Sequence, residues 1–472
     1  MNSARDKNGG PKLAKLFGTD GVRGVANREL TPEMVFKIGR ITASLLRGEN
    51  EDHRQAILVG RDTRLSGGML EGALAAGIAS TGTDVHRLGI ATTPAVAFLT
   101  RRLKAIAGVV ISASHNPIED NGLKIFNRRG LKLPQRLERQ IEQIYFSKSD
   151  PFPRATGPAV GQVYDNVTPV NRYLDYLKEH GPDLRGLRLV VDCGHGAACS
   201  IAPEIFSSLG ATLKVIHGTP DGSRINVNCG ATGPGRLGRE VVQWGGDLGL
   251  AFDGDADRLI AVDERGQVVD GDTIMAICAL EMVKQGKLNH NTLVVTVMSN
   301  GGLELLGQEH GFAVVRTPVG DRFVLEKMLK GGYNLGGEQS GHIIFTDYST
   351  TGDGLFTALQ LLKVVQERGS SFSELTGILP RFPQVLISRP VSSTAGWQSN
   401  EIIASEIAGL KERLGRHGQV LVRPSGTEPV IRVMLEAPLP EEELREAAQA
   451  LVEIIVRELD QPARIKLDEY GG

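Results

Sequence analysis

Three aspartates alternate with small residues in the segment AFDGDADR, which follows an apolar stretch of the sequence. At this spacing Asp253, Asp255 and Asp257 repel one another unless a cation neutralises them. Oxygen ligands alone suit a hard divalent cation, most naturally Mg²⁺. An EF-hand is excluded, because the glycine and glutamate of a calcium loop do not follow. We favour a metal site over a solvated acidic turn, and Arg258 adds a cation for a phosphate that also touches the metal.

A second polar loop, ISASHNPIEDNGLKIF, also follows an apolar segment. Ser114 and His115 are adjacent in it, but neighbours in sequence rarely form a nucleophile–base pair, and a loop serine is usually a turn former. The G-x-S-x-G elbow of acyl-transfer enzymes is absent around Ser114. Lys124 stands ten positions later, where a surface lysine and a catalytic lysine fit the sequence equally well.

Two further loops carry groups that suit a sugar phosphate. In GGEQSGH, a carboxylate and a hydroxyl between glycines suit vicinal sugar hydroxyls, although a simple glycine-flanked turn gives the same letters. In RPSGTEPVIR, a guanidinium, two hydroxyls and free backbone amides match a phosphate nest, which we favour over a plain hairpin turn because Arg432 also flanks it. The residues concerned are Glu338 and Ser340 in the first loop, and Arg423, Ser425, Gly426 and Thr427 in the second.

An outline of strand, turn, helix and strand occurs three times, and after each occurrence a further apolar strand ends in one of the polar loops. Any chain that alternates helices and strands can give such outlines by chance, but the regular position of the loops lowers that chance. Ligands bind outside the carboxyl ends of the strands of open α/β sheets, so three similar domains would each offer one loop to a shared cleft. The three outlines are residues 57–90, 187–217 and 292–319, and the three loop segments are residues 105–117, 247–258 and 333–342.

From about residue 376 the sequence pattern changes. It predicts a helix, two strands joined by a glycine turn, and an amphipathic helix over residues 441–459. The predicted fold class is therefore α/β, with three similar domains of mixed, largely parallel sheets and a smaller C-terminal α+β domain around one central cleft. The expected divisions are a disordered tail over 1–14, a phosphoserine domain over 15–168, a metal-binding domain over 169–268, a sugar-binding domain over 269–375 and a phosphate-binding domain over 376–472.

The composition excludes several classes of protein. The 472 residues are too many for one core, and 53 Lys+Arg against 55 Asp+Glu leave no positive excess for nucleic acid or an anionic membrane. No apolar run approaches the roughly 18 residues that span a bilayer, and the N-terminus lacks a secretory signal. Four cysteines form neither a disulfide framework nor a zinc spacing, so we expect a reducing, cytoplasmic location.

Together the loops indicate phosphoryl transfer on a sugar phosphate. From about residue 15 to about residue 459 the chain resembles the α-D-phosphohexomutase superfamily, on the motifs LFGTDGVRG, GRDTR, SASHNP with NGLKIF, FDGDADR, TPVGDR, GGEQSGH with TTGDG, and RPSGTEP. GEQSGH followed by STTGDG resembles the branch that acts on glucosamine phosphates, whereas relatives that act on mannose or glucose phosphates more usually carry GEMSGH. The segment RINVNCGATGPG departs from that branch, whose members typically read close to NINxxCGSTHPE.

The resemblance implies a role for each motif. Ser114 would be the phosphoserine that donates and recovers the phosphoryl group, and its phosphate would join the three aspartates around Mg²⁺. Lys124 would be the general acid/base, and neighbouring cations would favour its neutral form. Arg23, His115 and Arg258 would surround the phosphate of Ser114. The sugar would contact Thr317, Gly320, Glu338 and Ser340, and the phosphate that is not reacting would lie against Arg423, Ser425, Gly426 and Thr427.

The implied reaction interconverts glucosamine 6-phosphate and glucosamine 1-phosphate. It would pass through a sugar 1,6-bisphosphate, as intermediate and activator, and feed amino-sugar nucleotide and cell-wall precursor synthesis. The expected partner is this small hexosamine phosphate, with no nucleic acid and no membrane, and the chain would be a monomer or homodimer. Two alternatives stay open, namely a mutase for mannose or glucose phosphates and a non-catalytic sugar-phosphate-binding scaffold.

Overall fold

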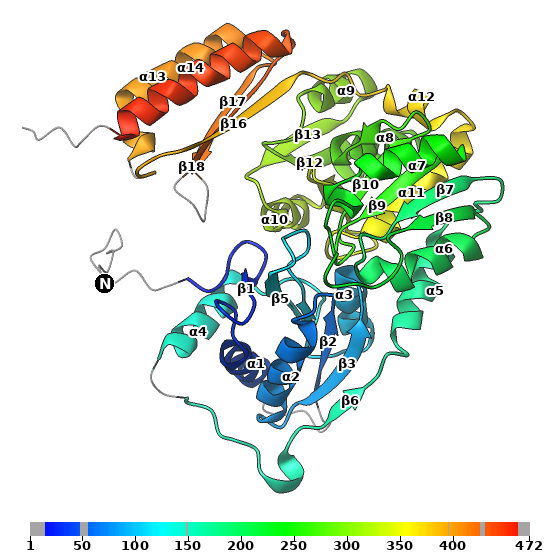
Figure 1. Cartoon of the computed structure of the whole chain (residues 1–472), viewed down its shortest axis with the longest axis vertical. Helices are drawn as coiled ribbons and strands as arrows, with labels where there is room; N and C mark the ends of the chain where they lie inside the picture. The colour runs from blue at the N-terminus through cyan, green and yellow to red at the C-terminus, as the bar shows by residue number, and fades with distance from the viewer. Residues whose placement is uncertain (1–14, 48–54, 148–149, 395, 425–429, 461–472) are drawn as a thin grey trace, which may run out of the picture. The chain divides into compact units, whose positions relative to one another are not determined.

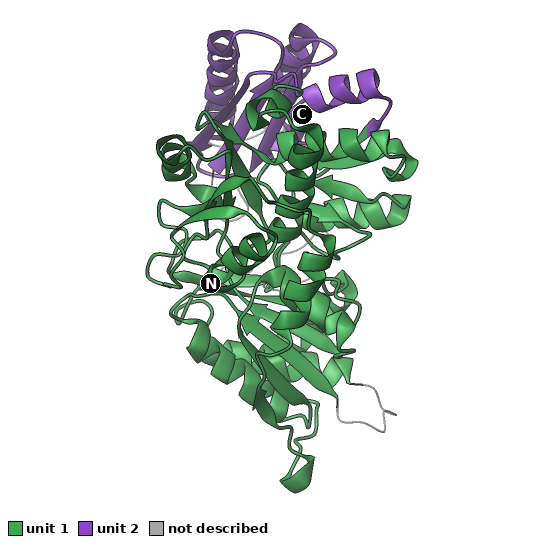
Figure 2. Cartoon of the chain, turned by 90° about the vertical axis from the view of Figure 1, so that its right-hand side faces the viewer, with its two compact units in different colours: residues 1–296, 314–378 green, residues 297–313, 379–472 purple. Residues whose placement is uncertain are grey.

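The structure is a computed structural model, and it describes residues 15–47, 55–147, 150–394, 396–424 and 430–460. Two compact units make up the chain (Figure 2): the first contains residues 1–296 and 314–378, and the second contains residues 297–313 and 379–472. In the described part of the chain, no helix has the length and apolar character needed to cross a membrane.

The first sheet has six strands in the order β1-β5-β4-β2-β3-β6. Its strands β2 and β3 lie side by side in the blue part of the ribbon (Figure 1). β2 (Ala56–Arg61) is parallel to both of its neighbours, β3 (Asp84–Ile90) and β4 (Ala107–Ile111). β5 (Asp120–Asn127) returns antiparallel to β4. The other elements of this region are β1 (Val22–Val25), β6 (Val163–Asp165), α1 (Pro32–Leu46), α2 (Gly67–Ala79), α3 (Thr93–Arg102) and α4 (Gln135–Phe146).

Both faces of this sheet are buried at its central strands, because β2 is apolar from Ala56 to Gly60 and β4 is apolar throughout. Ile57 and Val59 belong to a core that includes residues of α1 and α2, whereas Leu58 between them belongs to a core that includes residues of α3. Successive side chains of a strand point to opposite faces, so a continuous apolar run needs a helix layer on each side. The sequence-based expectation of a parallel, doubly covered sheet is confirmed here.

The second sheet repeats this plan with the order β11-β10-β9-β7-β8. β7 (Arg188–Asp192) is parallel to β8 (Thr212–Ile216) and to β9 (Leu248–Phe252), and β10 (Leu259–Asp263) is antiparallel to β9. The remaining elements are β11 (Val268–Val269), α5 (Val170–His180), α6 (Ala202–Ser208) and α7 (Gly235–Trp244).

The third sheet has the order β13-β12-β14-β15. β14 (Leu335–Gly337) is parallel to β12 (Thr292–Thr296) and antiparallel to β15 (Ile343–Phe345). The strand orders β5-β4-β2-β3, β10-β9-β7-β8 and β15-β14-β12-β13 therefore correspond, and they confirm the threefold repeat. The other elements are β13 (Ala313–Thr317), α8 (Gly271–Lys284), α10 (Asp321–Gly331), α11 (Gly354–Arg368) and α12 (Phe372–Thr376).

The second unit contains an antiparallel sheet of three strands, β16 (Gln384–Pro390), β18 (Val430–Glu436) and β17 (Gln419–Pro424), in that order. With α9 (Gly302–His310), α13 (Glu401–Leu414) and α14 (Glu441–Asp460) it makes up this unit. The apolar face predicted for the last helix is confirmed, since its buried residues are Leu444, Ala448, Leu451, Val452 and Ile455. Short 3-10 helices lie at Gly157–Ala159, Ala197–Ser200, Gly230–Thr232, Asn289–Asn291 and Trp397–Ser399.

Candidate active site

Ser114 follows β4 with a backbone φ of 54°, a left-handed conformation that is uncommon for a residue with a side chain. The surrounding structure holds it there: Ser114 N donates to Ser112 Oγ at 2.8 Å. The Ser114 carbonyl oxygen accepts from Arg64 Nη2 at 3.0 Å and from Asn226 Nδ2 at 2.8 Å. Its hydroxyl donates to Asp253 Oδ2 at 2.6 Å. The strained turn therefore directs the serine oxygen at the acidic loop.

Arg64, from the segment GRDTR, is a fully buried guanidinium behind the serine loop. Its Nε lies 3.0 Å from Asp62 Oδ2, which forms an ion pair with no exposure of either side chain. Its Nη2 also donates to the carbonyl of Asn116 at 2.8 Å, and its Nη1 donates to the carbonyl of Asp120 at 2.9 Å. One arginine thus fixes most of the serine loop, because the rigid fork of donors engages successive backbone carbonyls.

The acidic loop follows β9, and its three aspartates are brought together as predicted. One carboxylate oxygen from each of Asp253, Asp255 and Asp257 lies within 4.8 Å of the other two, and all three residues are buried. Asp255 Oδ1 and Asp257 Oδ1 receive no hydrogen bond from the described residues. Buried acceptors without donors are costly, and a cluster made only of oxygens suits a hard divalent cation. The residues present therefore fit a metal ion.

Two glycines allow the polar loops to approach one another. A Cβ atom on Gly254 would lie 2.6 Å from the carbonyl oxygen of Ser114, so only glycine lets the acidic loop pack against the serine loop. Gly341 has a φ of +90°, and a Cβ atom there would lie 2.1 Å from the carbonyl oxygen of Leu259 at the start of β10. The GGEQSGH loop thereby contacts the strand that leaves the acidic loop.

Lys124 lies on β5 and faces the acidic loop. Its Nζ is 2.7 Å from Asp255 Oδ2, 2.6 Å from Asp257 Oδ2 and 3.3 Å from Asp20 Oδ2. Burial alone would lower the pKa of Lys124, but these carboxylates outweigh it and raise the pKa well above its usual range. The sequence-based expectation put cations beside Lys124, whereas the charges closest to its amine in this arrangement are carboxylates.

Lys124 is part of a closed ring of buried and half-buried groups in which basic side chains alternate with carboxylates. Lys132 Nζ pairs with both Asp20 and Asp321. His342 lies with Nε2 3.4 Å from Asp321 Oδ2 and with Nδ1 3.5 Å from Asp257 Oδ1. The ring consists of Lys124, Asp20, Lys132, Asp321, His342 and Asp257. It links segments from the first, second and third sheets around the acidic loop.

The three residues expected around a serine phosphate lie near Ser114. His115 Nδ1 is 3.5 Å from Ser114 Oγ, and burial, followed by the charges of Arg258 and Arg23, lowers the pKa of His115 to about 3. Arg23 Nη1 donates to Asn116 Oδ1 at 2.9 Å. The Nε atoms of Arg23 and Arg258 are buried without a hydrogen-bond acceptor among the described residues. Two such donors beside a serine suit an anionic group.

The residues expected to contact a sugar are placed less uniformly. Glu338 Oε1 accepts a hydrogen bond from Gly320 N at 3.2 Å, so the TPVGDR and GGEQSGH segments meet. The hydroxyl of Thr317 is directed at backbone, with the carbonyl of Pro318 at 3.0 Å. Ser340 is exposed.

The predicted phosphate nest is described only in part. Arg423 lies on β17 of the second unit, directly opposite Arg432 on β18. Ser425, Gly426 and Thr427 lie outside the described residues. The nest therefore stays a prediction.

Sequence reasoning missed several residues that the fold brings to this site. The motif GRDTR was quoted, but Arg64 within it was given no role. Five of the missed residues belong to quoted segments, so those segments were a usable signal, whereas a lone lysine carries none. The missed residues are Asp20, Arg64, Asp321 and His342 in the motifs, Asn226 in the segment RINVNCGATGPG, and Lys132 outside any of them.

Comparison with known families matches nearly the whole chain. The families are phosphoglucomutase/phosphomannomutase alpha/beta/alpha domain I at residues 14–151, domain II at 171–266, domain III at 270–382 and the C-terminal domain at 386–454.

Curated relatives and solved structures agree with these families. Phosphoglucosamine mutase of Alkaliphilus oremlandii is 51% identical over 451 residues, which is 95% of this chain and 100% of that protein. That of Desulforamulus reducens is 52% identical over 425 residues, 90% of this chain and 95% of that protein. A phosphoglucomutase/phosphomannomutase family protein of Burkholderia thailandensis has a TM-score of 0.78 at 25% identity, over 94% of this chain and 97% of that one. N-acetylphosphoglucosamine mutase of Aspergillus fumigatus, solved with GlcNAc-6P and magnesium, shares the fold with a TM-score of 0.66 at 17% identity, over 95% and 96% of the two chains.

Proposed function

The chain belongs to the phosphoglucomutase/phosphomannomutase family of mutase enzymes, and on that premise we propose that it interconverts glucosamine 6-phosphate and glucosamine 1-phosphate. The observation that carries the proposal is the hydrogen bond of 2.6 Å between Ser114 Oγ and Asp253 Oδ2, inside a buried cluster of three aspartates. Relatives that are 51% and 52% identical carry the name phosphoglucosamine mutase, which supports the amino sugar as substrate.

The proposed reaction exchanges phosphoryl groups through Ser114. The C1 hydroxyl of glucosamine 6-phosphate attacks the phosphorus of phosphorylated Ser114, and the bond from that phosphorus to the serine oxygen breaks. The resulting 1,6-bisphosphate turns over, and its 6-phosphoryl group passes back to Ser114 to leave glucosamine 1-phosphate. Such transfers ask the protein mainly to align the oxygens and to stabilise charge, which agrees with the strained, tightly held serine turn.

We propose that Asp253, Asp255 and Asp257 hold Mg²⁺, with the phosphate of Ser114 as a further ligand. When bound, the ion would neutralise charge on the transferring phosphoryl group. The buried Oδ1 of Asp255, which receives no hydrogen bond from the described residues, supports this assignment.

Lys124 is proposed as the general acid/base. Its amine, held against Asp255 and Asp257, would give a proton to the oxygen that leaves phosphorus. Recovery of that proton from the attacking sugar hydroxyl completes the cycle. The ring through Asp20, Lys132 and Asp321 would position Lys124 for both steps.

The remaining roles follow the positions of the side chains. Arg23 and Arg258, each with a buried Nε that lacks an acceptor among the described residues, would bind the serine phosphate together with His115. The Gly320–Glu338 pair, with Thr317 and Ser340 on the same two segments, would bind sugar hydroxyls. Arg423, Ser425, Gly426 and Thr427 would hold the phosphate that is not reacting, and the four domain roles expected from the sequence are part of the same proposal.

The decisive test is the exchange Ser114→Ala. The variant is expected to lose mutase turnover by at least about 10³-fold, because it removes the group that carries the phosphoryl. Intact-mass measurement should find one phosphate on the wild-type chain and none on this variant, while Ser200→Ala, an exposed serine, serves as the matched control and keeps the phosphate. Undiminished turnover of Ser114→Ala would falsify the phosphoserine mechanism.

A second candidate substrate class is kept because the matched families are named for glucose and mannose phosphates. Assays of glucosamine, glucose and mannose 6-phosphates side by side, with the corresponding 1,6-bisphosphate added, separate the two. We expect the highest kcat/KM for the amino sugar. Equal or higher values for glucose or mannose phosphates would reject the amino-sugar assignment and leave the mutase mechanism in place.

A further inference from the structure

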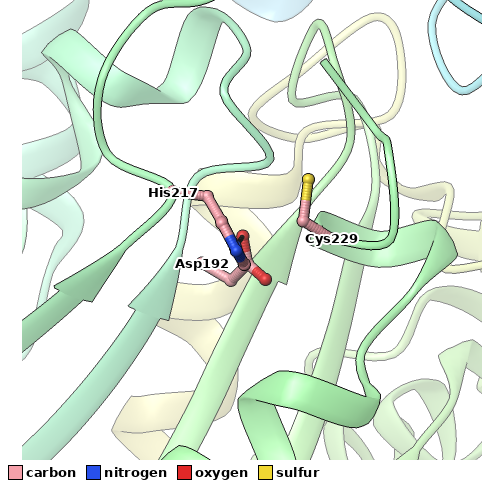
Figure 3. Close-up of side chains that lie close together, drawn as sticks. All are labelled: Asp192, His217 and Cys229. Carbon is pink, nitrogen blue, oxygen red and sulfur yellow. Dashed lines mark hydrogen bonds and ion pairs between the residues drawn. The ribbon is translucent and has the colours of Figure 1, made fainter. Parts of the chain in front are cut away.

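A second cluster of side chains with metal-ligand chemistry lies on the second sheet, apart from the three aspartates of the acidic loop. Asp192 is the last residue of β7, His217 directly follows the neighbouring parallel strand β8, and Cys229 precedes the short 3-10 helix Gly230–Thr232. Figure 3 shows the three side chains gathered beyond the ends of the strands, with Asp192 and His217 turned toward each other. A carboxylate oxygen, an imidazole nitrogen and a thiol sulfur lie within 4.8 Å of one another.

The carboxylate of Asp192 is completely buried without a permanent positive partner in the described structure. Its Oδ1 accepts from Gly194 N at 2.9 Å, and its Oδ2 accepts from Gly230 N at 3.0 Å. Among the described residues its only ion pair is with His217 Nδ1 at 3.0 Å, and a histidine carries charge only when protonated. A buried carboxylate held by backbone amides is oriented in advance and still has lone pairs for a cation.

The donor set decides which cation fits. One oxygen, one nitrogen and one sulfur are typical ligands of Zn²⁺, whereas Mg²⁺ and Ca²⁺ take oxygen alone. Deprotonated Asp192 and Cys229 with a neutral His217 would exactly balance a divalent charge. We infer that Asp192, His217 and Cys229 form a binding site for Zn²⁺ or a similar borderline-soft divalent cation, distinct from the site of the three aspartates.

Two features oppose metal binding, namely the thiol proton of Cys229 and the positive charge of Arg236. Burial, followed by the charge of Asp192, raises the pKa of the Cys229 thiol to about 12, so a bound metal must displace the thiol proton. Arg236 Nη1 lies 3.4 Å from His217 Nε2 and adds a positive charge at the edge of the cluster. Arg236 is largely exposed, with 53% of its side chain accessible, so solvent screens that charge.

The position of the cluster gives the bound ion a structural consequence. Asn226, three residues before Cys229, donates from Nδ2 to the Ser114 carbonyl at 2.8 Å, and its own N–H donates to the Gly194 carbonyl at 3.0 Å. An ion bound between Asp192 and Cys229 would therefore restrain the turn that contains Asn226, which in turn supports the serine loop. We expect the ion to stabilise the fold and to take no part in phosphoryl transfer.

Cobalt(II) is the probe for this site, because a thiolate ligand gives Co²⁺ an intense charge-transfer absorption in the near ultraviolet. The full-length protein is stripped of metal, saturated with Mg²⁺ to fill the aspartate site, and titrated with Co²⁺. We expect one equivalent to develop the thiolate band, and Zn²⁺ to abolish it by displacement. Oxygen ligands alone cannot produce this band, so the three aspartates cannot mimic the result.

Single substitutions assign the band to its ligands. Cys229→Ser should remove it, and His217→Asn should weaken Co²⁺ binding at least about 10-fold. Cys278→Ser, which alters another buried free thiol on α8, is the matched control and should keep the band. Zn²⁺ should raise the thermal unfolding temperature of wild type and of Cys278→Ser but not of His217→Asn.

Several outcomes overturn the inference. They are a wild-type protein that gives no thiolate band, a band that survives in Cys229→Ser, and equal Co²⁺ affinity in wild type and His217→Asn. A band lost in Cys199→Ser and kept in Cys229→Ser would also reject it, because the sulfur ligand would then be another thiol. If Cys229→Ser does not fold, the His217→Asn titration alone decides the question.

Discussion

Asp62 and Asp192 lie at corresponding places in two sheets of the same plan. Asp62 directly follows β2 and Asp192 ends β7, and these two strands hold the same position in the first and second sheets. Each carboxylate makes the same local turn, since Asp62 Oδ1 accepts from Arg64 N and Asp192 Oδ1 accepts from Gly194 N, both at 2.9 Å. The strand end and the turn that follows it therefore have the same structure in both sheets.

The two aspartates differ in what neutralises them. Asp62 Oδ2 accepts hydrogen bonds from Arg64 Nε at 3.0 Å and from Ser112 Oγ at 2.6 Å. The negative charge of Asp62 is therefore neutralised by a permanent cation inside the protein. Asp192 faces an imidazole and backbone amides instead. The carboxylate of Asp62 pairs with the arginine that holds the serine loop, whereas the carboxylate of Asp192 is able to bind a cation from solution. The same strand end and turn therefore support a neighbouring loop or offer a cation site, depending on which residue pairs with the aspartate.

The largest expected effect is that of Arg64→Met. It leaves Asp62 buried without its cation and removes the donors that hold the serine loop, so we expect a loss of about 3–5 kcal/mol of unfolding free energy. Turnover should fall about 100-fold as the serine is displaced. Urea unfolding and steady-state assays measure both. Arg185→Met removes an arginine that is 82% exposed and pairs with Asp183; it is the control and should leave the free energy of unfolding almost unchanged. Similar losses in the two variants would contradict the assigned role of Arg64.

The next effect is a pH dependence from Asp62. Burial, opposed by Arg64, raises its pKa from 3.8 to about 6, so the folded state binds more protons than the unfolded state between these values. Stability from this group is present below about pH 4 and is lost as pH rises through about 6, an amount on the order of 3 kcal/mol.

Urea unfolding of wild type and Asp62→Asn from pH 4 to pH 7 tests this dependence. The advantage of wild type over the variant should shrink as pH rises. Asp353→Asn is a positive control with the same expected sign, because burial also raises the pKa of Asp353 to about 6. Parallel stability profiles for wild type and Asp62→Asn would show that Asp62 does not titrate in this range.

A smaller effect is expected for Asp192→Asn measured without added transition metal. The amide oxygen can accept from only one of the two backbone donors, Gly194 N or Gly230 N, and the unsatisfied donor should cost about 1–3 kcal/mol. Chemical unfolding in chelator measures the change. A loss as large as that of Arg64→Met would mean that Asp192 is a structural support of the same kind as Asp62.

The smallest effect is that of Arg236→Gln. This exposed side chain contributes little to folding, and we expect a change below about 0.5 kcal/mol. Loss of its charge near His217 should tighten Co²⁺ binding by about two- to fivefold at low salt, and less at high salt. Weaker binding in the variant would place Arg236 among the supports of the site rather than opposed to it.

The sequence alone predicted whatever depends on short stretches of chain. The threefold outline, the α/β class and the helix over residues 441–459 follow from apolar periodicity, which acts locally. The cluster of Asp253, Asp255 and Asp257 was equally accessible, because five consecutive residues carry all three carboxylates. Such features need no knowledge of what lies across the fold.

Only the tertiary structure decided which distant residues share an environment. Lys124 was expected among cations, yet the fold places it against Asp20, Asp255 and Asp257. The charges closest to its amine are therefore negative instead of positive. The spacing of the four cysteines matched no zinc pattern, but parallel strands end at one edge of a sheet and bring Asp192 and His217 together there. Charge interactions fall off with distance in space, and distance in sequence does not determine them.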